Sequence, residues 1–129
     1  MIANARFVGA WLLTSFETRQ PDGSTTYPLG HDPIGIICWD ESGWFSAQLG
    51  RREPGAAGYI AYYGILEAPD AASGTLIHRL HGSSNPSRVA GDQVREFEFL
   101  DDDTIVLSPP PSPSGARSYL TWRRRPRVA

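Results

Sequence analysis

Residues 93–100 read QVREFEFL, a run in which aromatic and acidic side chains alternate. Arg95 and Phe97 fall on one face of an extended chain, and Glu96 and Glu98 fall on the opposite face. Alternation with a period of two residues is typical of a β-strand that turns one face to a core and the other to water. The stretch therefore predicts a strand whose inner face carries a guanidinium beside phenylalanine rings.

Runs of the same kind recur along the chain, and turns rich in Gly, Pro, Asp and Ser separate them. Helix signals are scarce, and the segment PPPSPSG at 109–115 excludes both a helix and a central strand. Eight sequential strands with mostly short connections predict an all-β fold, a single antiparallel up-and-down β-barrel, because closure removes both exposed sheet edges. The predicted strands are 8–19, 34–39, 44–49, 59–67, 75–81, 93–100, 104–108 and 117–125.

The length of the chain fits one domain over residues 1–129, which is long enough to bury a core of its own. Cys38 is the single cysteine, so no internal disulfide can form, and we expect a buried, inert thiol between Ile37 and Trp39. The net charge of −2 gives no basis for binding nucleic acid, and the basic run 123–127 is interpreted as a strand end with a solvated tail.

The sequence predicts a cytoplasmic protein that uses neither a membrane nor a cofactor. No signal peptide is recognised, and no window approaches the ~20 apolar residues of a membrane span. The three histidines lack the spacing of metal ligands, so no metal is expected. All twelve basic residues are arginine, which excludes a lysine Schiff base and a P-loop. Either a monomer or a homodimer is compatible with these features.

Gly9-Ala10-Trp11 begins the first predicted strand, which continues as GAWLLTSFE. With the later segments DGSTTYPLGHDPIGIICW, SGWFSAQL, YIAYYGILE, DQVREFEF and YLTWRR, it resembles the lipocalin-like domain family of bacteria and fungi across nearly the whole chain. The resemblance implies an eight-stranded, lipocalin-like barrel. It also implies that Gly9 and Trp11 close one barrel end under an arginine of the last strand, which is Arg124, or Arg123 if the strand phase is shifted by one.

Two polar residues are predicted to face the barrel interior. His78 lies between two leucines of one strand face, and its imidazole could act as a general acid or base or be a hydrogen-bonded core residue. Arg95 could bind a carboxylate, enolate or carbonyl oxygen of a ligand, or it could form an ion pair with Glu17 or Glu67. Tyr62 completes the candidate catalytic set because it could move a proton.

Further residues are predicted to line a cavity or to fill the core. In the first strand, Trp11, Leu13 and Ser15 are expected on one face and Phe16 on the other. Aromatic area is what the wall of a small-molecule site needs, although each aromatic residue could equally be core packing. The candidates for the ligand wall are Trp39, Trp44, Gln48, Tyr59, Tyr63 and Phe97.

Three functions are compatible with such a barrel. The first is binding of a small hydrophobic metabolite, with its polar end anchored by Arg95 and His78. The second is a cofactor-independent cyclase or isomerase of the pericyclase type, acting on a polyketide or terpenoid biosynthetic intermediate. The third is a packed barrel that serves as an interaction or structural subunit. The first two use the same residue types, so the sequence alone does not separate them.

Overall fold

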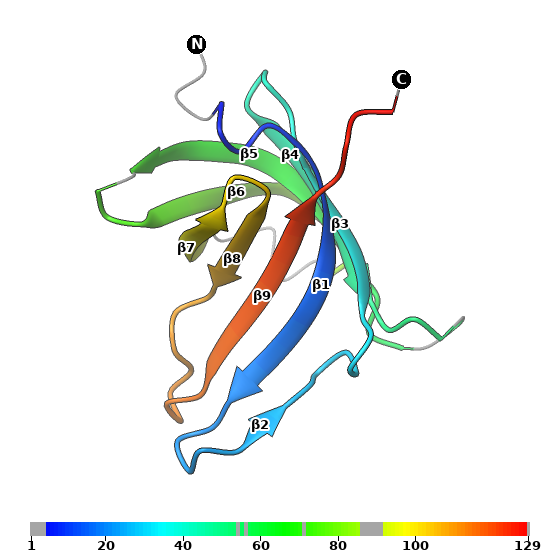
Figure 1. The fold of residues 1–129 in the computed structure, drawn as a ribbon, viewed down its shortest axis with the longest axis vertical. Coiled ribbons are helices and arrows are strands. Elements are labelled where there is room, and N and C mark those ends of the chain that lie inside the picture. Colours follow the sequence, from blue (N-terminus) through cyan, green and yellow to red (C-terminus); the bar gives the residue numbers. More distant parts are fainter. Residues whose placement is uncertain (1–4, 54, 56, 71, 86–91, 129) are drawn as a thin grey trace.

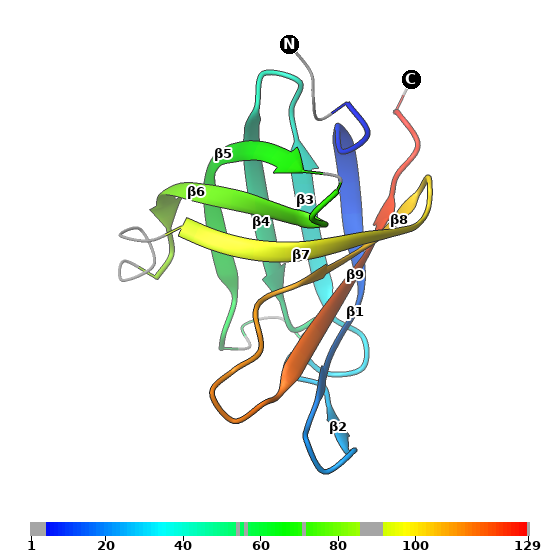
Figure 2. The ribbon, with the colours of Figure 1, turned by 90° about the vertical axis from the view of Figure 1, so that its left-hand side faces the viewer.

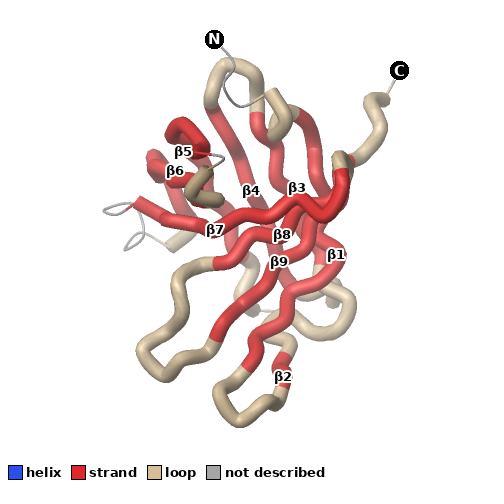
Figure 3. Tube along the Cα trace, turned by 60° about the vertical axis from the view of Figure 1, so that its left-hand side comes forward, coloured by secondary structure: helices blue, strands red, loops and turns tan. Residues whose placement is uncertain are grey.

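Strands make up all of the regular secondary structure in residues 5–53, 55, 57–70, 72–85 and 92–128, which the computed structural model describes. Figure 3 shows only strands and loops along this part of the chain. The strands are β1 (Gly9–Arg19), β2 (Thr25–Thr26), β3 (Ile34–Trp39), β4 (Trp44–Gly50), β5 (Ile60–Asp70), β6 (Thr75–Ser83), β7 (Asp92–Asp101), β8 (Thr104–Ser108) and β9 (Arg117–Arg124).

Eight of these strands form a closed antiparallel barrel, as Figures 1 and 2 show. Each strand from β3 to β9 pairs with its neighbour in sequence, and β1 pairs with both β3 and β9, so no strand of the ring is left with a free edge. The predicted all-β, up-and-down, lipocalin-like fold is confirmed. The two-residue strand β2 was not predicted; it is an exposed extension of the β1 hairpin at one end of the barrel.

A bulge in β1 corrects the predicted facing of that strand. Leu13 pairs with Trp122, but the next pair joins Ser15 to Thr121, so Thr14 is an extra residue in β1. An extra residue shifts the alternation by one position. Phe16 therefore turns to the inner face, and the expectation that Ser15 would lie on that face was wrong.

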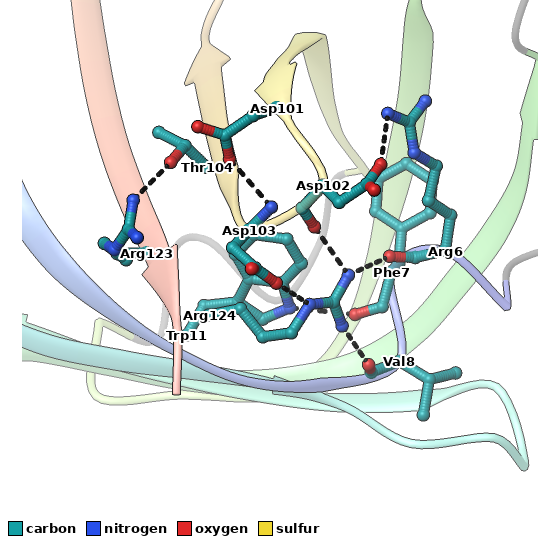
Figure 4. A network of polar contacts seen from close by, with 10 residues as sticks. All are labelled: Arg6, Phe7, Val8, Trp11, Asp101, Asp102, Asp103, Thr104, Arg123 and Arg124. Atoms are coloured by element: carbon teal, nitrogen blue, oxygen red, sulfur yellow. Dashed lines mark hydrogen bonds and ion pairs between the residues drawn. The ribbon is translucent and has the colours of Figure 1, made fainter. Parts of the chain in front are cut away.

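Trp11 and Arg124 close one end of the barrel (Figure 4). The guanidinium carbon of Arg124 lies 4.2 Å from the centre of the Trp11 ring, so Arg124 rather than Arg123 is the arginine stacked on this tryptophan. Trp11 is fully buried, and its indole N–H donates to the carbonyl oxygen of Phe7 at 2.9 Å. Gly9 has a φ of 136°, and a Cβ there would lie 3.1 Å from an Arg124 nitrogen, so the motif needs its glycine.

Arg124 also ties three separate segments together at this end of the barrel. It donates hydrogen bonds to the carbonyl oxygens of Val8, Arg6 and Asp102, the last two at 2.6 and 3.2 Å. Its Nε lies 3.2 Å from a carboxylate oxygen of Asp103 in the β7–β8 turn. The chain before β1, the β7–β8 turn and the end of β9 are thus held together by one side chain (Figure 4).

No helix in the described residues is long and apolar enough to cross a membrane.

Candidate functional site

A cavity of about 260 Å³ lies inside the barrel, toward the end opposite Trp11 and Arg124. Its position follows from the register, because Phe16 and Leu120 form a pair in the half of β1 and β9 that lies beyond the bulge. Apolar side chains form most of the wall. The lining residues are Phe16, Leu49, Ile60, Tyr62, His78, Arg95, Leu107, Pro109, Leu120 and Trp122.

His78 is the most buried polar residue of this wall, with 1% of its surface exposed. The indole N–H of Trp39 donates to Nε2 of His78 at 3.1 Å, and the imidazole stacks on Phe45 with ring centres 4.0 Å apart. Burial, with a smaller contribution from the positive charge of Arg95, lowers the pKa of His78 to about 3. The imidazole is therefore neutral at pH 7.

Arg95 and Tyr62 lie on the same cavity as His78, so the structure brings the three candidate catalytic residues together. Arg95 is half-buried in β7, and its Nη1 donates to the carbonyl oxygen of Val94 at 2.9 Å. Tyr62 packs edge-on against Phe45 with ring centres 5.9 Å apart. Their catalytic roles stay predictions, because the arrangement by itself shows only a polar corner in an apolar wall.

Two of the predicted wall residues are inside the barrel but do not line the cavity. Trp39 is 2% exposed, and its indole N–H donates the hydrogen bond that His78 accepts. Phe97 lies in the core toward the closed end, where its ring centre is 5.1 Å from that of Phe7. These two residues therefore shape the cavity indirectly.

The other four predicted wall residues, Trp44, Gln48, Tyr59 and Tyr63, are on the outer surface, so their assignment to the cavity wall was wrong. Trp44 is 44% exposed, and Tyr59 and Tyr63 are each 50% exposed. Gln48 accepts a hydrogen bond from the Tyr59 hydroxyl at 2.7 Å on that surface. In β4 the inner face belongs instead to the smaller residues at 45, 47 and 49, which are fully buried.

Several residues of the cavity wall were missed by the sequence interpretation. Phe16 was placed on the wrong face because the alternation of the sequence does not reveal the bulge at Thr14. Leu120 and Trp122 share an inner face of the last strand, so their pattern could have identified them. Leu49 was missed because the sequence interpretation assigned the inner face of β4 to Trp44 and Gln48. Leu49 lies on the opposite face of this strand, which is the buried one.

Cys38 is exposed on the outer face of β3, so the expected buried thiol was wrong. Its neighbours Ile37 and Trp39 are buried, and alternation places the residue between them outside. Partial burial raises the pKa of the Cys38 thiol. Among the described residues, no group of three or more His, Cys, Asp or Glu side chains could hold a metal ion.

The buried imidazole should make stability depend on pH. Because the pKa of His78 is about 3 in the folded chain and about 6.5 in an unfolded one, only the unfolded state binds this proton between those values. Stability should therefore fall as the pH drops below about 6.5. The loss is about 1.4 kcal/mol per pH unit, or roughly 2 kcal/mol between pH 7.5 and pH 5. Urea unfolding at the two pH values measures it.

Replacing His78 with phenylalanine should remove this pH dependence, whereas replacing the exposed His81 with glutamine should leave it intact. Equal slopes in both variants would contradict the assignment. If His78→Phe does not fold, the imidazole signals of the wild-type protein can be followed by NMR instead. The His78 signal should then show no titration between pH 8 and pH 5.

A ring closed by pairing of the first and last strands, with one sealed end and one internal cavity, defines the class of lipocalin-like barrels. Residues 8–58 match the family model described as "Lipocalin-like domain", the family that the sequence motifs resemble. Among solved structures, the chain is similar to a de novo designed fluorescence-activating beta barrel, with a TM-score of 0.49 and 16% identity over 97% of this chain and 99% of that one. No curated protein matches the chain significantly.

Proposed function

We propose that this barrel binds one small, largely apolar molecule, with the polar end of that molecule placed at Arg95 and His78. The observation that carries the proposal is the cavity itself. Its apolar wall is interrupted at one side by an imidazole and a guanidinium. Small-molecule sites combine in the same way a mainly apolar surface with a few polar groups that fix orientation.

The size of the cavity limits the ligand. A cavity of roughly 150 Å³ lined by apolar side chains holds benzene, which corresponds to about 25 Å³ for each non-hydrogen atom. On that scale the 260 Å³ here holds about ten non-hydrogen atoms. The proposed ligand is therefore one or two rings or a short chain. A barrel built only for packing would fill this space with side chains, so the cavity favours binding over the packed-subunit alternative.

The geometry around His78 favours binding over the cyclase or isomerase alternative as well. A general base near neutral pH works best with a pKa near 7, and the pKa of this imidazole is about 3. Its Nε2 already accepts the hydrogen bond of Trp39. The residue is thus built as a fixed, neutral hydrogen-bonding group.

Filling the cavity tests the proposal. Replacing Leu120, which lines the cavity, with tryptophan should place an indole in the ligand's volume. We expect naphthalene and cinnamate to give saturation-transfer NMR signals with the wild-type protein and none with Leu120→Trp. The matched control is Tyr119→Trp, one position away on the outer face of β9, which should bind both probes like the wild type. Absence of signal from the wild-type protein, or unchanged signal from Leu120→Trp, would rule out this site.

A further inference from the structure

Two buried N–H groups of the cavity wall have no hydrogen-bond partner among the described residues. They are Nδ1 of His78 and Nε1 of Trp122. Both side chains are 1% exposed, so bulk water does not reach them. Leaving a buried donor unpaired costs roughly 1–3 kcal/mol in general. A partner for either group has to come from inside the barrel.

The hydrogen bond from Trp39 settles which nitrogen of His78 carries the proton. An indole N–H can only donate, so Nε2 of His78 must be the acceptor. A neutral imidazole has a single N–H, which is therefore on Nδ1. Both unpaired groups are consequently donors, and each can be satisfied only by an acceptor atom.

The charge at the cavity points in the same direction. Arg95 contributes a permanent positive charge to the wall, and none of the described lining residues is acidic.

We infer that the cavity selects an organic anion. This ligand has a compact apolar body, contains about ten non-hydrogen atoms and ends in a carboxylate, or in an enolate or phenolate oxygen that is likewise ionised at neutral pH. The inference rests on the proposed function and names the class of ligand for the same site. An anionic oxygen accepts hydrogen bonds from several donors at once, and charge-assisted bonds of this kind are about twice as strong as neutral ones. An ammonium group offers only donors and carries the same charge as Arg95, so it is excluded from this corner.

Three probes of nearly equal shape separate the possibilities. Cinnamate, cinnamamide and cinnamylamine share one apolar body and differ in the charge and donor character of the polar end. We expect calorimetric titration at pH 7.5 to show cinnamate binding about tenfold more tightly than cinnamamide, with no detectable binding of cinnamylamine. Binding of cinnamate and cinnamamide with equal affinity would overturn the inference and leave the proposed function standing. Failure of all three probes would overturn both.

Two variants test whether the preference for an anion comes from Arg95. Replacing Arg95 with glutamine should reduce cinnamate binding about tenfold, to the level of cinnamamide, while the affinity for cinnamamide stays unchanged. The matched control is Arg123→Gln, an exposed arginine of β9 whose guanidinium donates to Thr104. It should leave both affinities as they are. Loss of cinnamate binding in both variants alike would show that general surface charge, and not this site, attracts the anion.

Discussion

Replacing Trp11 with alanine should lower the free energy of unfolding by about 4 kcal/mol. The side chain is fully buried between Trp39 and the guanidinium of Arg124, and its N–H holds the chain before β1 through Phe7. The substitution therefore leaves a large void, removes a cation–π contact and frees the N-terminal segment from the barrel. Urea unfolding followed by far-UV circular dichroism measures the loss.

The outer tryptophan of β4 provides the control for this prediction. Trp44 is 44% exposed and contacts the ring of His81, so Trp44→Ala should cost less than about 1 kcal/mol. If Trp11→Ala is too unstable to purify, Trp11→Phe should still show an intermediate loss of roughly 2 kcal/mol. Similar losses at positions 11 and 44 would contradict the inside and outside assignment of the barrel.

Replacing Gly64 with alanine should destabilise the barrel by about 3 kcal/mol or prevent folding. A Cβ at this position would overlap the carbonyl group of Arg79 on the neighbouring strand. The register of β5 and β6 shifts between Tyr63 and Gly64, and the two backbones approach each other closely at this point. A backbone carbonyl cannot swing aside, so relief of the overlap would break β5–β6 hydrogen bonds.

Gly82 on β6 is the matched control for Gly64. A Cβ at Gly82 would also meet close neighbours, but they are all atoms of the Tyr63 ring. Tyr63 is half exposed and can turn toward solvent, so Gly82→Ala should cost less than about 1 kcal/mol. Thermal unfolding monitored at equal protein concentration compares the two. An equal loss in both variants would mean that the close approach at Gly64 is not the cause.

The positions of the strands could be predicted because their signals are local. β3 and β8 begin and end where the sequence placed them, since β-branched runs there are bounded by Gly, Pro and Asp turns. The inner face of β7 was also predicted, because Arg95 alternates with two glutamates that belong in water. In each of these cases a few neighbouring residues contain the whole signal.

The composition of the cavity wall was harder to predict, because it depends on which face of each strand turns inward and not on residue type. In β4 the large Trp44 suggested an inner face, but the fully buried Ala47 lies on the true one. In β5 Tyr62 and Tyr63 are adjacent, so only one of them can face inward, and that one is Tyr62. The bulge at Thr14 depends on pairing with β9, more than 100 residues away in the chain, and no local pattern reports it.

The contacts made by Arg124 have a consequence for how the protein can be attached to a surface or fused to another protein. It binds the chain before β1 to the end of β9 at the sealed end of the barrel, on the side away from β2 in Figure 1. The residues that line the cavity lie in the other half of the barrel. A tether added at either of these ends would lie away from the residues that line the cavity. The barrel could thus be immobilised on a sensor surface or fused to a reporter without masking the site.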